Sequence, residues 1–165
     1  MSDALEPVDE GEFRAALARF ATGVIVVSAR TDRDHAMTAS AFSSVSLDPP
    51  LVLVCVESAA RFHEAIVDSG VWGVSILPRE HRPVAQWLSR PGRPLVGQFD
   101  QVPHHRGRLG MVLIDDALAT LECRTTAVHP AGDHSIVVGE VLSVGIADRP
   151  EDALVYFRSQ YGSLA

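Results

Sequence analysis

The sequence predicts a mainly β protein with flanking helices, in which the strands form a predominantly antiparallel barrel. Five short runs rich in β-branched residues, each bounded by turn-forming residues, occur at residues 24–28, 51–56, 71–76, 119–126 and 136–144. Stretches with helical spacing occur at residues 9–23, 61–68 and 79–89. A length of 165 residues fits one domain, which we place at residues 9–165 behind a flexible arm at residues 1–8.

The first helix is predicted to begin at Asp9. Glu12 follows three residues later, as in a capping box. An apolar stripe at helical spacing consists of Phe13, Leu17 and Phe20. We expect this stripe to pack the helix onto the body of the domain, and Gly23 to end the helix.

The other two helices have clear stop signals. Ser69-Gly70 closes the helix at residues 61–68, and an Arg-Pro-Gly sequence ends the helix at residues 79–89. Residues 90–110 are rich in Pro, Gly and Arg and form the longest irregular stretch. We consider a lid and a dimer contact as roles for that stretch.

Composition excludes two classes of partner. The net charge of −7, with no Lys or Arg cluster, argues against a nucleic-acid surface. No apolar stretch approaches the roughly 20 residues of a membrane span, and the acidic N-terminus has no apolar segment. We therefore expect a cytoplasmic protein that binds neither nucleic acid nor membrane.

Three residue types limit the chemistry. All 14 basic residues are arginine, so any phosphate would be held by guanidinium groups, backbone N–H groups or hydroxyls. Cys55 and Cys123 each lie in an apolar run, which favours free thiols over a disulfide. The histidines have no recognisable ligand spacing, so we predict no metal site.

Residues 36–50 are the most unusual segment, because they are small and hydroxylated where a strand would normally have bulky side chains. Such a segment gives a ligand close access to the backbone. Its N–H groups and hydroxyls suit the ribityl chain and phosphate of a flavin nucleotide, and Pro49-Pro50 would end it. The alternative from composition alone is a Ser-rich turn between strands.

Three segments together resemble the flavin reductase family, the small reductase components of two-component flavin-dependent monooxygenases. They are Thr22 to Val27, Met37 to Pro50 continuing through Val56, and Gly132-Asp133-His134. Their order and spacing match the family over roughly residues 10 to 162. The resemblance implies the split β-barrel that binds FMN, built as a homodimer with each flavin near the subunit interface.

The resemblance also implies a set of flavin contacts. The cofactor-binding residues would be Met37, Thr38, Ser40, Ala41, Ser46, Cys55, Val56, Glu57, Arg61 and Phe62. Met37, Thr38, Ser40 and Ala41 would line the isoalloxazine and ribityl chain, and residues 55–57 would pass the ring edge through their backbone. Arg61 would meet the phosphate; the alternative is a solvated residue at a helix start.

His134 is the catalytic residue that the resemblance implies, placed over the reactive face of the flavin where nicotinamide docks. Asp133 would fix its tautomer or cap the turn. The nicotinamide-binding residues would be Asp133, His134 and Tyr161. Without the resemblance, a lone turn histidine is more often structural or exposed, and Tyr161 serves equally in packing.

Hydride transfer from nicotinamide to flavin needs no protein nucleophile, because the cofactors carry the chemistry. The sequence has no G-x-S-x-G elbow, no G-x-G-x-x-G turn and no P-loop. We therefore predict an NAD(P)H:flavin oxidoreductase that supplies reduced flavin to a partner monooxygenase. The alternatives are a barrel that uses tightly bound FMN on its own substrate and a non-catalytic flavin-binding module.

Some residues depart from the family pattern. Glu57 and Ala59 stand where more polar neutral or basic residues are frequent, and Glu80-His81 replaces a frequent Glu-Gln. A carboxylate near the flavin disfavours extra phosphates, which favours FMN over FAD slightly. The negative net charge likewise favours NADH over NADPH.

Overall fold

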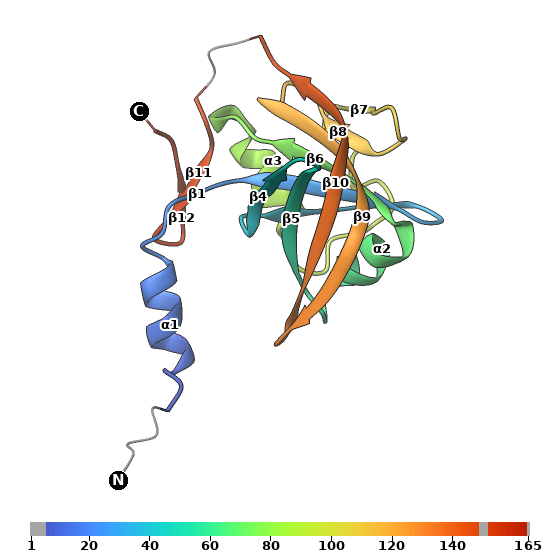
Figure 1. Ribbon diagram of the computed structural model, residues 1–165. Coiled ribbons are helices and arrows are strands. Elements are labelled where there is room, and N and C mark those ends of the chain that lie inside the picture. Colours follow the sequence, from blue (N-terminus) through green and yellow to red (C-terminus); the bar gives the residue numbers. More distant parts are fainter. Residues whose placement is uncertain (1–5, 149–151, 165) are drawn as a thin grey trace.

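A seven-stranded antiparallel sheet forms the body of the molecule in the computed structural model, which describes residues 6–148 and 152–164 (Figure 1). The strands are β1 (Thr22–Gly23), β2 (Ile25–Arg30), β3 (Asp34–Ala39), β4 (Phe42–Leu47), β5 (Pro50–Glu57), β6 (Val71–Ile76), β7 (His104–Arg106), β8 (Val112–Ile114), β9 (Ala119–Ala131), β10 (His134–Ile146), β11 (Val155–Phe157) and β12 (Gln160–Gly162). The helices are α1 (Glu10–Leu17), α2 (Arg61–Ser69), the 3₁₀ helix η1 (Arg79–His81) and α3 (Arg82–Leu88).

The large sheet curls into a barrel that stays unpaired at one seam. Its strand order is β3-β2-β6-β9-β10-β5-β4, so β3 and β4 are its two edges. Only Ser40 and Ala41 separate these edge strands in the chain, which keeps the edges within about 11 Å of each other at that point. This arrangement confirms the predicted mainly β, split-barrel fold.

The predicted strands are all present, and β6 has the predicted bounds. β9 and β10 are longer than predicted, 13 residues each, and their pairing shifts register next to Val138 and again next to Val141. Such irregularities increase the local twist and help a long hairpin to coil around a barrel. At Gly139 an added Cβ would lie 2.6 Å from the Trp72 ring, so this close packing requires glycine.

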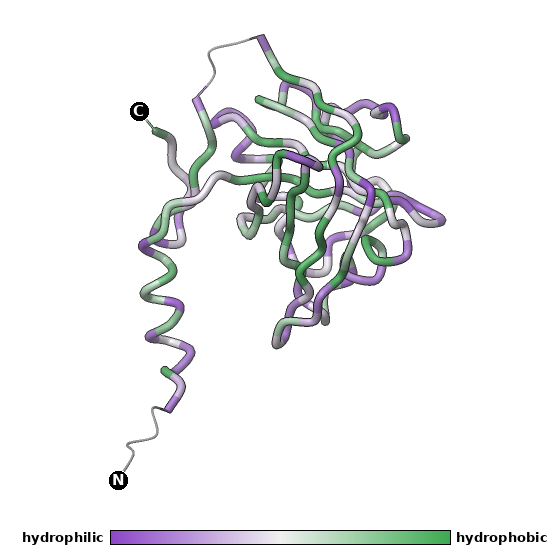
Figure 2. Tube along the Cα trace, in the orientation of Figure 1, coloured by the Kyte–Doolittle hydropathy of each residue, from purple (hydrophilic) through white to green (hydrophobic). Residues whose placement is uncertain are grey.

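Two apolar clusters hold the strands and helices together. The first fills the barrel around Trp72 and is covered at one end by Phe62, Ala65 and Ile66 of α2. The second lies outside the barrel, where Leu77 packs against α3 and the C-terminal strands. Figure 2 shows hydrophobic residues concentrated along the barrel strands.

The predicted helix stop at Gly70 is confirmed, because Gly70 adopts a left-handed conformation with φ of 64° directly after α2. The predicted helix at residues 79–89 is divided into η1 and α3, with Pro83 in the first turn of α3. Among the described residues, no helix is long and apolar enough to cross a membrane.

The first helix begins as predicted and ends earlier. Asp9 Oδ1 accepts hydrogen bonds from the N–H groups of Gly11 at 2.8 Å and Glu12 at 3.2 Å. The helix ends at Leu17, whereas Gly23 belongs to β1, so the predicted end was wrong. The reason is tertiary: residues 22–23 pair with β11, which draws the chain into a sheet.

The expected packing of α1 onto the body was also wrong for the single chain. None of its residues is buried, and Figure 1 shows α1 pointing away from the barrel. The side chains of the apolar stripe are 55%, 52% and 70% exposed at Phe13, Leu17 and Phe20. Of the predicted flexible arm, residues 6–8 are exposed and residues 1–5 lie outside the described residues.

Residues 90–110 are bound to the outside of the barrel, and β7 within this stretch forms a hairpin with β8. The buried Gln98 amide donates to the backbone oxygen of Asp34 at 2.8 Å. Ser28 Oγ donates to the backbone oxygen of Val112 at 2.6 Å. Side-chain bonds of this kind fix the segment in place, which does not favour the lid that we considered.

Candidate active site

A cleft of about 810 Å³ opens beside the seam of the barrel. It receives three of the predicted cofactor-binding residues, Ser40, Ala41 and Cys55. The backbone N–H of Cys55 donates to the backbone oxygen of Ala41 at 2.9 Å, which holds the seam against β5. The small side chains at residues 39–41 leave the backbone accessible, as expected for a segment that a ligand approaches closely. We call this the seam cleft.

A second cleft, of about 360 Å³, lies at the α2 end of the barrel. Four other predicted residues line it, namely Met37, Glu57, Arg61 and Phe62. Arg93 lines it as well, from the segment after α3. We call this the arginine cleft. The predicted flavin set is therefore divided between two clefts.

Three predicted cofactor residues line neither cleft. The Thr38 hydroxyl donates to the backbone oxygen of Ala85 in α3 at 2.7 Å. Val56 is fully buried in the barrel core, so its side chain is not available, although the prediction concerned its backbone. Ser46 lies in β4, next to a register shift against β5.

The Gly132-Asp133-His134 turn joins β9 to β10 and lies beside the end of β5. Gly132 has a φ of 65°, which explains the glycine at this turn. His134 pairs in register with Glu57, and the N–H of Ser58 donates to the backbone oxygen of Asp133 at 2.8 Å. Strand pairing therefore places the predicted catalytic histidine next to the predicted cofactor segment.

Asp133 contacts the His134 ring, the geometry required by one of the two roles considered for it. Nδ1 of His134 lies 2.7 Å from Oδ1 of Asp133, so the opposite ring nitrogen, Nε2, is the atom available to a ligand. The hydrogen bond from His134, followed by its charge, lowers the pKa of Asp133. The side chain of His134 is 44% exposed, which leaves the ring accessible.

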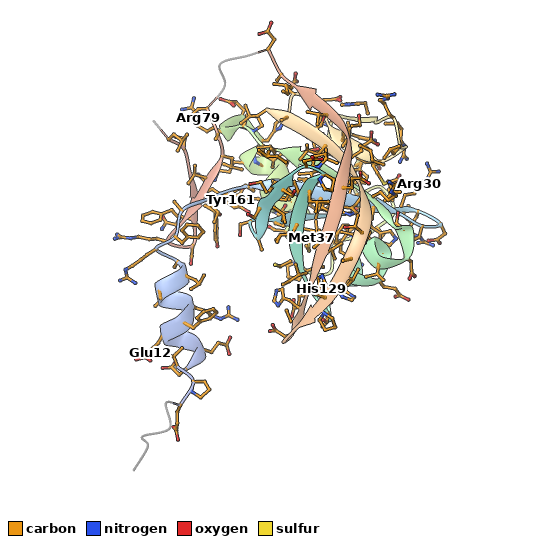
Figure 3. The ribbon with its side chains drawn as sticks, in the orientation of Figure 1. Glu12, Arg30, Met37, Arg79, His129 and Tyr161 are labelled. Atoms are coloured by element: carbon orange, nitrogen blue, oxygen red, sulfur yellow. The ribbon has the colours of Figure 1, made fainter. Side chains whose placement is uncertain are left out.

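Tyr161 lies apart from this turn within one chain. Its ring contacts Tyr156 at a centroid distance of 5.3 Å and packs against the cluster outside the barrel. Figure 3 labels Tyr161 near β1 and β11, well away from His129 on the β9–β10 hairpin. The predicted nicotinamide set is thus only partly assembled in the single chain.

Two contacts in this region were missed by sequence reasoning. His63 Nε2 in α2 lies 2.8 Å from the buried Oγ of Ser135, which follows the predicted catalytic histidine. Arg61 Nη2 donates to the backbone oxygen of Arg93 at 2.8 Å. These pairs are 72 and 32 residues apart, and no local spacing signals them.

The two cysteines are free thiols. Burial, followed by the charge of Glu122, raises the pKa of Cys123 to about 12, so this thiol is not a nucleophile at neutral pH. Within residues 6–148 and 152–164, no three His, Cys, Asp or Glu side chains are grouped so that they could hold a metal ion.

Comparisons with known proteins identify the family of this chain. The model of a family described as flavin reductase like domain matches residues 17–165. The reductase component of 4-hydroxyphenylacetate 3-monooxygenase from Thermus thermophilus is 40% identical over 153 residues, which cover 92% of this chain and 95% of that protein.

Two solved structures share the fold over almost their full length. The flavin reductase component of a bacterial two-component tryptophan halogenase has a TM-score of 0.89 at 44% identity, covering 94% of this chain and 98% of that one. The NADH:FAD oxidoreductase of Streptomyces globisporus, solved with NAD and FAD fragments, has a TM-score of 0.91 at 32% identity, covering 99% and 98%. This chain therefore belongs to the flavin reductase-like family.

Proposed function

We propose that this protein transfers a hydride from NADH to FMN or FAD and releases the reduced flavin to a separate monooxygenase. The observation that carries the proposal is the pairing of His134 with Glu57, which joins the Gly-Asp-His turn to the strand that borders both clefts. Relatives that are NADH-dependent flavin reductases and reductase components of two-component monooxygenases support it.

The residues of both clefts fit a flavin nucleotide. Ser40, Ala41 and Cys55 offer small side chains and backbone groups to a flat ring, and Arg61 offers a guanidinium to a phosphate. The bound flavin would supply the hydride acceptor and the nicotinamide the donor, so the protein has to orient two rings and exclude water.

His134 would act by orientation. Asp133 engages Nδ1, which orients the ring and leaves Nε2 to bind a nicotinamide carboxamide. The His63–Ser135 contact and the Ser58–Asp133 bond hold the turn on both sides. A ring held in this way loses little entropy when the substrate binds.

We further propose that the functional unit is a homodimer. The α1 stripe is exposed. The edge strand β4 carries Leu47 at 96% exposure, and β10 carries Ile146 at 81%. Apolar surface of this extent on an unpaired edge favours burial against a second copy. Within one chain, Tyr161 and His134 do not form one nicotinamide site. In a homodimer, residues of the second copy would complete it.

The partner in this proposal is a flavin-dependent monooxygenase, reached by diffusion of reduced flavin. The expected location is the cytoplasm. NADH is preferred to NADPH because of the net charge of −7.

The test is NADH oxidation by the purified protein with FMN, with FAD and without flavin. Turnover should saturate with added flavin, and His134→Ala should lower kcat/KM for NADH roughly 10- to 100-fold because the nicotinamide loses its orientation. His129→Ala is the matched control, since it removes a histidine from the same hairpin. Flavin binding without NADH oxidation would contradict catalysis and favour a non-catalytic flavin-binding module.

A further inference from the structure

The arginine cleft carries a charge opposite to that of the whole chain. Three arginines line it, Arg61, Arg90 and Arg93, against the single carboxylate of Glu57. The chain as a whole has a net charge of −7. Burial lowers the pKa of His35, which also lines the cleft, so this ring is mainly neutral at pH 7. A locally positive cleft in an acidic protein favours an anionic ligand.

None of these three arginines forms an ion pair with a carboxylate among the described residues, although other arginines do. Arg106 pairs with Asp34 and Arg124 with Glu140, whereas Arg61 donates to the backbone oxygen of Arg93. This hydrogen bond holds the Arg61 guanidinium against the loop that carries Arg93, and no ion pair with a carboxylate of the described residues neutralises either arginine.

Arg93 is half-buried and held in place by neutral groups. Its Nη2 donates to the backbone oxygen of Ala36 and, at 3.4 Å, to Oε1 of Gln98. Burial, followed by the charge of Arg61, lowers the pKa of Arg93. Two like charges brought together in a partly buried place raise the energy of the empty cleft, and an anion between them would lower it.

We propose that Arg93 is a second phosphate-binding residue, which acts with Arg61 to hold the phosphate end of the flavin nucleotide in the arginine cleft. This inference rests on the proposed flavin reduction. It gives the irregular segment after α3 a role in binding, because the segment supplies the guanidinium and is fixed to the barrel by Gln98.

The same charge balance bears on which flavin binds. Glu57 alone suggested a preference against extra phosphates, but it faces three arginines in this cleft. The cleft therefore accepts the dianionic phosphate of FMN and tolerates the two phosphates of FAD. Riboflavin, which has the ring and ribityl chain without phosphate, gains nothing from these arginines.

The experiment compares dissociation constants of riboflavin, FMN and FAD, measured by flavin fluorescence, in the wild type and in Arg93→Gln, Arg61→Gln and Arg93→Lys. We expect either Gln variant to raise the FMN and FAD constants roughly tenfold and to leave that of riboflavin unchanged. Arg93→Lys should retain most of the FMN affinity, because it keeps the charge. Arg124→Gln is the control, since it removes an arginine from a surface ion pair on β9.

Salt gives a second readout. Higher ionic strength should weaken FMN binding in the wild type more than in Arg93→Gln, because the variant has lost one charge that salt screens. Arg61 is exposed at the start of α2, so Arg61→Gln should fold even if Arg93→Gln unfolds the loop.

Three outcomes would overturn the proposal. These are an equal loss of riboflavin affinity in both Gln variants, no change for any flavin, and a change confined to the KM for NADH. Failure of the proposed function itself would look different, since the wild type would then oxidise no NADH with any flavin while the binding contrast remained.

Discussion

Residues 93–114 and helix α1 both lie outside the barrel sheet, and they differ in how they are attached. The segment at residues 93–114 is fixed by buried polar groups, among them Gln98 and Glu122, which are 2% and 1% exposed. Helix α1 has an apolar stripe and no buried residue. The stripe predicted packing, while the Pro-, Gly- and Arg-rich composition of residues 90–110 predicted an irregular stretch.

Hydrogen bonds to buried polar side chains therefore hold a segment more firmly than an apolar face that has no partner. Glu122 Oε1 accepts hydrogen bonds from the N–H groups of Leu109 at 2.9 Å and Met111 at 3.3 Å. Gly107 approaches the same carboxylate so closely that a Cβ would collide with it. By contrast, an apolar stripe stabilises only what it covers, and α1 covers nothing in the single chain.

The largest effect on the attachment of residues 93–114 is expected from Glu122→Ala. The substitution should lower the free energy of unfolding by about 3 kcal/mol, because it leaves the buried N–H of Met111 and the part-buried N–H of Leu109 unpaired and opens a cavity. Chemical denaturation of the wild type and the variant measures the loss. Glu122→Gln keeps an acceptor oxygen and should lose much less; an equal loss would show that shape alone matters at this position.

A smaller effect is expected at the ion pair between Asp34 and Arg106, which joins β3 to β7 at 2.6 Å. The hydrogen bond from Arg106 is the main cause that lowers the pKa of Asp34, so its contribution is present above the unfolded pKa of about 3.9 and is lost as pH falls through the lower folded pKa. Asp34→Asn should cost at most about 1 kcal/mol at pH 7, and the difference from wild type should shrink below pH 4.

Thermal unfolding over this pH range tests whether the stabilisation by the ion pair is lost on acidification. Hydrogen exchange shows which residues the ion pair stabilises. Asp34→Asn should raise amide exchange at residues 104–114. Asp32→Asn is the control, because Asp32 pairs with Arg33 in the neighbouring turn and does not contact this segment. Faster exchange in both variants would mean that the turn, and not the ion pair, holds the hairpin.

The smallest effect on the stability of the single chain is expected in α1. Phe13→Ser with Leu17→Ser should change it by less than about 0.5 kcal/mol, since both side chains are exposed. If the apolar stripe packs against a second copy of the chain, the double variant should sediment more as a monomer than the wild type does. Glu12→Gln should leave the assembly unchanged. A large loss of stability in a monomeric sample would mean that α1 packs within its own chain.

Much of the fold could be predicted because its signals are local. β-branched runs gave β2, β5, β6, β9 and β10, and Gly70 marked the end of α2. The Gly-Asp-His turn was likewise predictable, since Gly132 adopts the positive φ that such a turn requires. The end of α1 was not predictable, because pairing of β1 with β11 decided it over about 130 residues of separation.

The sequence by itself determined five of the strands, the end of α2 at Gly70, the family and the residue types of the candidate site. Only the tertiary structure decided that Glu122 is buried under the β7–β8 hairpin, that the predicted flavin residues divide between two clefts, and that Arg93 meets Arg61. The physical reason is that turns and strand periodicity act between neighbours in the chain. Hydrogen bonds between a side chain and a distant backbone depend on a geometry that exists only after the barrel closes.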